Sequence, residues 1–255
     1  MCTVSFIPLK NGIILTSNRD EHISRGIALY PEFYNVNKRS LAFPKDTKAG
    51  GTWFITNEMG DAGVLLNGAF NKHIPAPPYK KSRGMVLPEL FQEHSPYLAT
   101  KNYDFNGIEN FTLILWEQGR LREINWDGQF IHVKEHHPEL PSIWSSVTLY
   151  TPLMRLERHG WFKQWLDAQK HISQKTVIEF HSGTKAENKE FGLRISRTNN
   201  ISTTSTTSLY MNNRDACFYH IDYIQNIESV LDFDIKAFNA KKIVDYTENE
   251  SAQKN

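Results

Sequence analysis

Apolar and polar positions alternate from the start of the chain. Residues 3–8 and 12–17 are short apolar runs rich in β-branched residues, and Asn11-Gly12 between them is typical of a tight turn. This pattern predicts a β-hairpin that begins close to residue 2. Similar runs predict further strands over residues 52–56, 62–67, 111–117, 121–126, 146–150, 205–211 and 216–223.

Apolar residues recur at helical spacing in three other segments. Residues 83–93 predict a helix that Pro88 kinks or delays. Residues 152–170 predict a longer helix, because Thr151-Pro152 supplies an N-cap and a proline at the first helical position. Residues 173–181 predict another helix. The apolar stripe of the longer helix would consist of Leu153, Leu156, Trp161, Phe162, Trp165 and Leu166.

The order of these elements predicts the architecture. Strands come first, helices follow, and strands return near the end, which favours sheets with helices packed outside them. The chain has 255 residues, of which 40% are hydrophobic, so one domain with a sizeable core is expected over residues 1–245. Residues 74–79 contain three prolines and predict a loop, and residues 246–255 predict a frayed polar tail.

Charge and cysteine content exclude several classes of protein. With 29 basic and 28 acidic residues there is no strong field to attract nucleic acid, and no run approaches the roughly 18 apolar residues that span a bilayer. The N-terminus lacks the pattern of a secretory signal, so we expect a cytoplasmic protein. Cys2 and Cys217 are the only cysteines and cannot form a disulfide framework.

Cys2 is the first candidate for chemistry. Removal of Met1 would leave a thiol beside a free α-amine, so nucleophile and base would share one residue. The α-amine has an ordinary pKa of about 7.7 to 8.0, and its neutral fraction can accept the thiol proton near neutral pH. The alternative is that Cys2 is merely a small residue at the start of an edge strand.

The end of the second predicted strand adds charge near Cys2. It reads Ser17-Asn18-Arg19-Asp20-Glu21, and in a hairpin with a short turn this end lies close to residue 2. Arg19 and Asp20 could lower the pKa of the thiol and orient the α-amine. The alternative is a solvated turn with a surface ion pair of little energetic value.

These residues carry a resemblance to a known family. Met1-Cys2-Thr3, Asn18-Arg19-Asp20-Glu21 and Gly50-Gly51-Thr52-Trp53 resemble the NRDE family, which includes transport and Golgi organisation protein 2. Leu66-Asn67, Ser82-Arg83-Gly84 and Thr151-Pro152 look like further features of it. The resemblance implies an α+β N-terminal nucleophile hydrolase-like fold, a four-layer αββα sandwich of two antiparallel sheets flanked by helices, related to cysteine amidases that act on non-peptide C–N bonds.

The resemblance also implies roles for single residues. Cys2 would be the nucleophile and, through its amine, the base, while Arg19 and Asp20 would set its electrostatics. Asn67 would stabilise the oxyanion of the tetrahedral intermediate. Asn18 and Trp53 are the candidates for binding substrate.

Two positions depart from the family pattern. Ser146 stands where the family tends to have an asparagine, and Thr203-Thr204-Ser205 lacks an arginine that is usual there. Two functions therefore stay open. One is a cysteine amidohydrolase acting on a small amide or acyl substrate; the other is a binding or carrier protein without chemistry, for which the family suggests haem as ligand.

Other sequence features give weaker indications of function. His136-His137 with Glu139 lacks a third ligand at zinc-like spacing, so we expect no metal and no cofactor. A plain interaction module is a third reading, supported only by aromatic residues such as Tyr30 and Phe33. The sequence gives no indication of oligomeric state.

Overall fold

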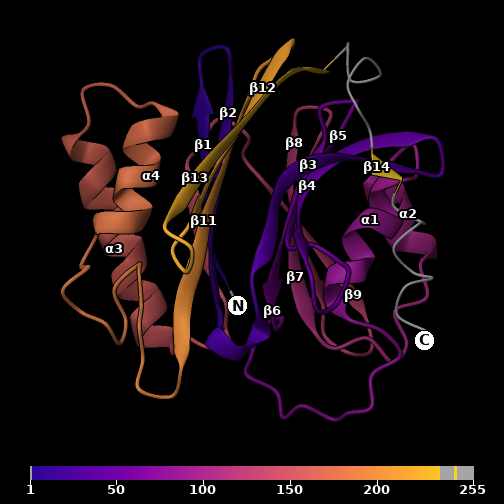
Figure 1. Ribbon diagram of the computed structural model, residues 1–255, viewed down its shortest axis with the longest axis horizontal. Coiled ribbons are helices and arrows are strands. Elements are labelled where there is room, and N and C mark those ends of the chain that lie inside the picture. Colours follow the sequence, from indigo (N-terminus) through magenta and orange to yellow (C-terminus); the bar gives the residue numbers. More distant parts are fainter. Residues whose placement is uncertain (1, 236–243, 246–255) are drawn as a thin grey trace.

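Two β-sheets lie face to face and carry helices on their outer faces (Figure 1). The computed structural model describes residues 2–235 and 244–245. One sheet has six strands in the order β10 (Ser142–Ser145), β1 (Cys2–Leu9), β2 (Gly12–His22), β11 (Ile201–Met211), β12 (Asp215–Asp222) and β13 (Ile227–Asp234). The other has eight in the order β14 (Val244–Asp245), β3 (Ala28–Val36), β4 (Arg39–Asp46), β5 (Phe54–Asn57), β6 (Ala62–Asn67), β7 (Phe111–Glu117), β8 (Arg120–Trp126) and β9 (Ile131–His136).

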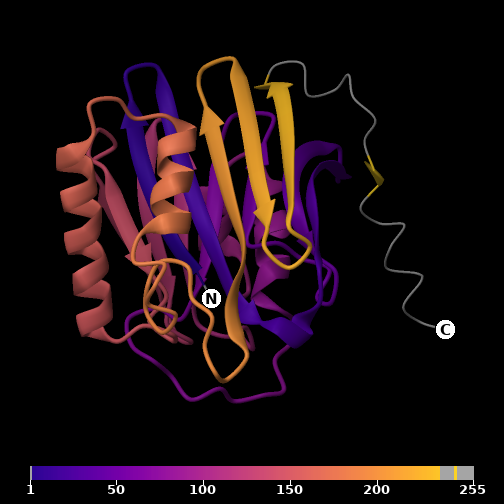
Figure 2. The ribbon, with the colours of Figure 1, turned by 60° about the vertical axis from the view of Figure 1, so that its left-hand side comes forward.

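Helices complete the four layers. α3 (Pro152–Ala168) and α4 (Gln174–Gly183) pack on the six-stranded sheet, and α1 (Val86–Phe91) and α2 (Pro96–Asn102) on the eight-stranded one. Figure 2 shows α3 and α4 over one side of their sheet, with β12 and β13 lying beside them. Neighbouring strands are antiparallel except β14, which runs parallel to β3. The predicted αββα sandwich of two essentially antiparallel sheets is confirmed.

The N-terminal hairpin is the element that positions the site. β1 and β2 pair from Cys2 opposite Arg19 to Leu9 opposite Gly12, so the predicted hairpin is confirmed and is longer than expected. Gly12 opens β2, where a Cβ atom would lie 2.3 Å from the carbonyl oxygen of Met211. Only glycine allows this close approach of β2 and β11.

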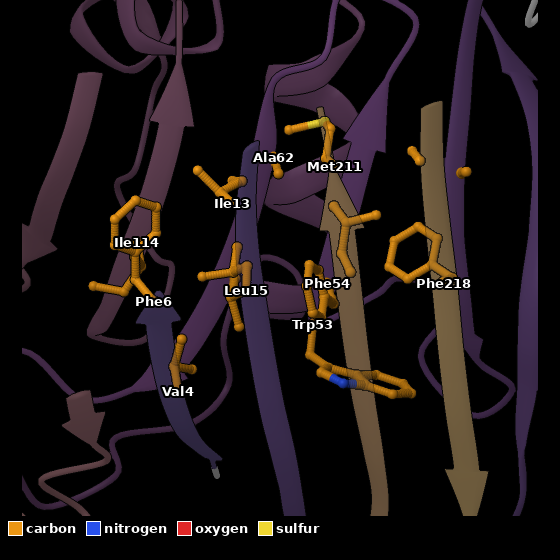
Figure 3. Close-up of a cluster of buried hydrophobic side chains, with 14 of the residues drawn as sticks. Val4, Phe6, Ile13, Leu15, Trp53, Phe54, Ala62, Ile114, Met211 and Phe218 are labelled. Carbon is orange, nitrogen blue, oxygen red and sulfur yellow. The ribbon is translucent and has the colours of Figure 1, made fainter. Parts of the chain in front are cut away.

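The main apolar core fills the space between the sheets. Figure 3 shows this cluster, with Met211 at one end and Trp53 at the other. Alternate residues of β1, including Val4 and Phe6, point into it because successive side chains of a strand face opposite ways. Cys2 belongs to the same inward-facing set. The thiol therefore lies where β1 begins, at the border of the intersheet core.

The segment before α3 differs from the prediction. The strand is Ser142–Ser145, whereas residues 146–150 form a turn in which the N–H groups of Leu149 and Tyr150 donate to the carbonyl of Ser146. The prediction of a strand over 146–150 was wrong because this turn satisfies those backbone groups locally. Helix α3 then begins as expected, with the Thr151 hydroxyl accepting from the Met154 N–H.

The buried face of α3 also differs from the predicted apolar stripe. Leu153 and Leu156 are about two-thirds exposed, whereas Phe162 and the whole of Arg158 are buried against the sheet. The terminal nitrogens of the Arg158 guanidinium donate to the carbonyls of Phe191 and Gly192, which gives the buried cation hydrogen-bond partners at this interface. None of the described helices is long and apolar enough to cross a membrane.

A buried histidine predicts how stability depends on pH. His181 of α4 is fully buried, its Nε2 lies 2.7 Å from the Ser5 hydroxyl, and burial together with the Arg158 charge lowers its pKa from 6.5 to about 3. Between these values the unfolded chain binds a proton that the folded chain does not. We therefore expect the free energy of unfolding to fall by about 1.4 kcal/mol per pH unit as the pH drops below 6.5, from this residue alone.

Urea unfolding at several pH values between 7.5 and 4.5 would measure this slope. In the variant His181→Gln, the slope of the free energy of unfolding against pH should correspond to about one fewer proton bound on unfolding. His137→Gln, at an exposed position of the chain, is the matched control and should leave the slope unchanged. Equal slopes for the wild type and His181→Gln would contradict the assignment.

Candidate functional site

A cavity of about 360 Å³ opens between the sheets where β1 begins. Cys2, Trp53 and Asn67 line it, together with the loop that carries Ser82 and Gly84. The lining also contains seven charged side chains: Arg19, Glu21, Arg25, Asp46, Lys81, Arg83 and Glu109. The cavity next to the intersheet core is therefore lined largely by polar and charged side chains, and the Cys2 thiol lies in its wall.

Cys2 is held in place through its backbone. It pairs with Arg19 across the hairpin, and its carbonyl accepts a hydrogen bond of 2.9 Å from the Ser146 N–H. Burial raises the pKa of the Cys2 thiol above its ordinary value, the Asp20 charge adds to this, and Arg19 acts in the opposite direction. The expected lowering of the thiol pKa is therefore not found, because burial outweighs the arginine.

Arg19 is fixed by three contacts. Its guanidinium lies 2.6 Å from the Asp46 carboxylate, donates to the Thr204 hydroxyl at 3.1 Å, and stacks over the Trp53 ring at 4.8 Å. Arg25 binds the same Asp46 oxygen at 2.9 Å. Although burial opposes it, the charges of Arg19 and Arg25 and the Ala49 N–H hold the pKa of Asp46 below its ordinary value. The arginine is thus an ordered cation beside the thiol.

Asp20 and Asn18 lie on the other face of β2, because neighbouring residues of a strand point to opposite sides. The Asp20 carboxylate accepts from the Tyr150 hydroxyl at 2.6 Å and from the Thr203 hydroxyl at 2.7 Å. The Asn18 amide donates to the carbonyls of His181 and Leu193. Neither residue lines the cavity, although the Asp20 charge reaches the Cys2 thiol and raises its pKa.

Trp53 and Asn67 do line the cavity. Trp53 is buried, and its indole N–H has no hydrogen-bond partner among the described residues. The Asn67 backbone carbonyl accepts from the Ser146 hydroxyl at 2.8 Å, and no hydrogen bond of its side-chain amide is found in the described chain. The amide is therefore available as a donor to a bound molecule.

The two positions that depart from the family pattern both lie at this site. Ser146 contacts Cys2 and Asn67 through its N–H and hydroxyl groups, and Thr204 contacts Arg19. Ser146 therefore holds the backbone of Cys2 and Asn67, and Thr204 holds the Arg19 guanidinium.

Two glycines bring the loop of residues 82–85 against the cavity. The Thr52 N–H donates to the Gly84 carbonyl at 2.9 Å, and a Cβ atom on Gly51 would lie 2.2 Å from the Gly84 carbonyl carbon.

We expect Gly51→Ala to lower the free energy of unfolding by about 1–3 kcal/mol, because the loop of residues 82–85 must move away. Urea unfolding measures this, and Gly160→Ala, which meets no atom within 4 Å, is the control. Equal effects of the two substitutions would contradict the packing.

Sequence reasoning missed several residues of the cavity. The sequence pattern assigns no role to Asp46, Arg25 or Glu109, and it marks Arg83 only as a family feature. Asp46 lies in a polar run just before Gly50-Gly51, which is the one local signal that could have pointed to it. The described chain holds no group of three or more histidine, cysteine or acidic side chains that could bind a metal.

Comparison with solved structures places the fold. An N-acylethanolamine-hydrolyzing acid amidase ortholog of Caenorhabditis elegans shares 10% sequence identity, with a TM-score of 0.56 over 82% of this chain and 92% of that one. A mutant conjugated bile acid hydrolase of Clostridium perfringens shares 11% identity, with a TM-score of 0.52 over 92% and 94% of the two chains. At such identity the likeness concerns the fold alone, which is that of N-terminal nucleophile hydrolases.

Sequence comparison gives the family. No curated protein matches the chain. The profile of the family described as Transport and Golgi organisation 2 matches residues 1–179, which is more than half of the sequence. The chain belongs to the Transport and Golgi organisation 2 family.

Proposed function

We propose that this protein hydrolyses small non-peptide amides, with Cys2 as its nucleophile. The observation that carries the proposal is the position of the thiol, in the wall of a 360 Å³ cavity with Arg19 paired beside it and the Asn67 amide in the same wall. Two solved structures of this fold are named as an N-acylethanolamine-hydrolyzing acid amidase and a conjugated bile acid hydrolase, which supports hydrolysis as the reaction class.

The chemistry depends on a base next to the thiol. Because burial raises the thiol pKa, Cys2 stays protonated unless a nearby group accepts its proton. After removal of Met1 the α-amine of Cys2 would be that group. The sulfur then attacks the carbonyl carbon, the Asn67 amide donates to the developing oxyanion, and the proton passes from the α-amine to the leaving amine. Water hydrolyses the resulting thioester and releases the acid.

Arg19 and Asp20 have separate tasks in this proposal. Arg19 favours the thiolate because its positive charge lies on the cavity side of the sheet. Asp20 acts as a positioning residue, since its hydrogen bonds to Tyr150 and Thr203 fix β2 from behind. Asn18 similarly ties β2 to the segments around α4, and Trp53 orients the Arg19 guanidinium.

Hydrolysis of a panel of N-acyl amides, read as release of the amine, tests the proposal. Acyl groups from acetyl to decanoyl and leaving amines with and without charge should be included. We expect turnover of at least one short member, and a loss of about tenfold or more in kcat/KM for Asn67→Ala, because an oxyanion donor is removed. Absence of turnover across the panel by protein that begins at Cys2 would reject the amidase proposal.

A second function rests on Ser146 and Thr204. Because Ser146 contacts the Cys2 backbone and Thr204 contacts Arg19, loss of chemistry with retention of binding is the alternative, and haem is the ligand that the family suggests. Titration with haem, followed by the Soret band in the wild type and in Cys2→Ala, tests it. A saturable shift supports the carrier function, and its absence in both proteins removes it.

A further inference from the structure

Two of the three acidic side chains that line the cavity, Asp46 and Glu109, are paired within the protein. The third, Glu21, accepts from the His22 N–H through one oxygen, and its other oxygen lies 3.8 Å from Arg25 Nε. One Asp46 oxygen accepts from Arg19 and Arg25, and the other accepts from the backbone N–H groups of Lys48 and Ala49. Both oxygens of this carboxylate are therefore satisfied within the protein.

Glu109 is satisfied from two sides. One of its oxygens lies 3.0 Å from His73 Nε2, and the other lies 2.9 Å from the Arg83 guanidinium. If Arg83 turned toward a bound molecule, Glu109 would keep its histidine partner. The Arg83–Glu109 pair can therefore open without leaving an isolated buried carboxylate.

Two of the cavity's cations have unused donors. Arg25 binds Asp46 through Nε, and its two terminal nitrogens make no hydrogen bond to the described residues. Arg83 uses its terminal nitrogens for Glu109 and the Asn110 carbonyl, which leaves its Nε unused in the same part of the chain. Lys81 differs, because Glu89 and the Tyr103 hydroxyl already accept from its ammonium group.

Arg25 and Arg83 thus keep spare donors, whereas the carboxylates of Asp46 and Glu109 already have partners. The natural complement of these donors is a group with acceptors and negative charge, and planar guanidinium groups match a carboxylate in particular. The electrostatics agree: burial lowers the pKa of Arg83 and the nearby Arg25 adds to this, although Glu109 and Glu21 act in the opposite direction. A bound anion beside Arg25 and Arg83 would offset the repulsion between their positive charges.

We propose that Arg25 and Arg83 bind the carboxylate of the substrate, which is therefore a small amide that carries a carboxylate, such as an N-acylated amino acid. The amide part of this assignment rests on the proposed function, whereas the carboxylate part rests only on the donors of the two arginines. Arg25 and Arg83 are then specificity-determining residues.

Binding to the full-length Cys2→Ala protein tests the proposal without turnover. N-acetylglycine and N-acetylglycinamide differ only in carboxylate against carboxamide, and isothermal titration at low salt compares them. We expect the acid to bind about tenfold more tightly, as charge-assisted hydrogen bonds imply. The preference should fall in Cys2→Ala/Arg25→Gln and in Cys2→Ala/Arg83→Gln.

Arg214→Gln in the same background is the matched control. This arginine is exposed, pairs with Asp215 and Asp234, and should leave the preference unchanged. Equal affinity for the two probes, no binding of either, or a preference that survives both cavity substitutions would overturn the proposal. If Arg83→Gln fails to fold, the more exposed Arg25→Gln alone decides.

The result is separable from the amidase test. Carboxylate-selective binding without any turnover would leave this inference standing and reject the proposed function. Turnover of neutral amides together with equal binding of the two probes would do the reverse.

Discussion

Cys2→Ala is expected to reduce amide hydrolysis by about 10³-fold or more while leaving the fold intact. The substitution removes the thiol from the cavity wall and keeps the α-amine, Arg19 and Asn67 in place. The backbone contacts of residue 2 with Arg19 and Ser146 do not depend on the thiol, so the free energy of unfolding should change by only about 1 kcal/mol. Initial rates on the best amide of the panel, together with urea unfolding, measure both quantities.

Cys217→Ala is the matched control for this prediction. Cys217 lies on β12, outside the lining of the cavity, and should be replaceable without effect on rate. Full activity of Cys2→Ala would show that another group performs the reaction. Equal losses in the two variants would indicate a general effect of removing a thiol.

Arg158→Met is expected to cause the largest loss of stability, about 3–5 kcal/mol in the free energy of unfolding. Arg158 is fully buried, stacks on the Tyr150 ring at 3.5 Å and donates to Thr3 and to the Gly192 carbonyl. Burial raises the pKa of Asp20, and the Arg158 charge is the largest influence that holds it down. Removing the guanidinium leaves the buried Asp20 carboxylate with its Tyr150 and Thr203 hydrogen bonds but without this nearby positive charge, and it leaves the Gly192 carbonyl unpaired.

Chemical denaturation of the wild type and two variants checks this value. Lys163→Met makes the same cation-to-methionine change at an exposed position of the same helix and should shift the free energy of unfolding by about 0.5 kcal/mol or less. Similar effects of the two substitutions would show that the buried network contributes little. A large loss for Arg158→Met alone would confirm that Arg158 stabilises the packing of Thr3 on β1, Tyr150 and the segment at Gly192.

The architecture was predictable where local patterns agree with tertiary packing. The hairpin of β1 and β2 and the start of α3 follow from alternation, turn residues and the Thr151 cap, and the structure confirms them. β3 and β4 were missed because Pro31 and Pro44 interrupt the apolar pattern that predicts strands. β9 was missed because its side chains are largely exposed and mostly polar.

The buried face of α3 shows a different limit. A hydrophobicity pattern marks leucines as core residues and arginines as surface residues. Here Leu153 is exposed, and Arg158 is buried because carbonyls of a distant segment accept hydrogen bonds from its guanidinium. Such a partner lies more than thirty positions away in the chain and leaves no local signal.

The candidate site was predictable only in part. The closeness of Cys2 and Arg19 follows from the hairpin, since the two residues are direct cross-strand partners. Strand alternation could also have placed Asp20 and Asn18 on the opposite face, but closeness in sequence suggested a shared site instead. Asp46 and Glu109 come from distant segments, so their meeting with Arg25 and Arg83 depends on the tertiary fold.

Intact-mass spectrometry of the native protein tests the central claim most directly. The mass is measured before and after a brief incubation with an amide substrate, and the reaction is stopped by lowering the pH. The account predicts a chain that begins at Cys2, and a covalent acyl adduct that maps to Cys2 and is absent in Cys2→Ala. A protein that retains Met1 yet hydrolyses the amide would contradict the account, because Cys2 would then have no free α-amine to serve as its base.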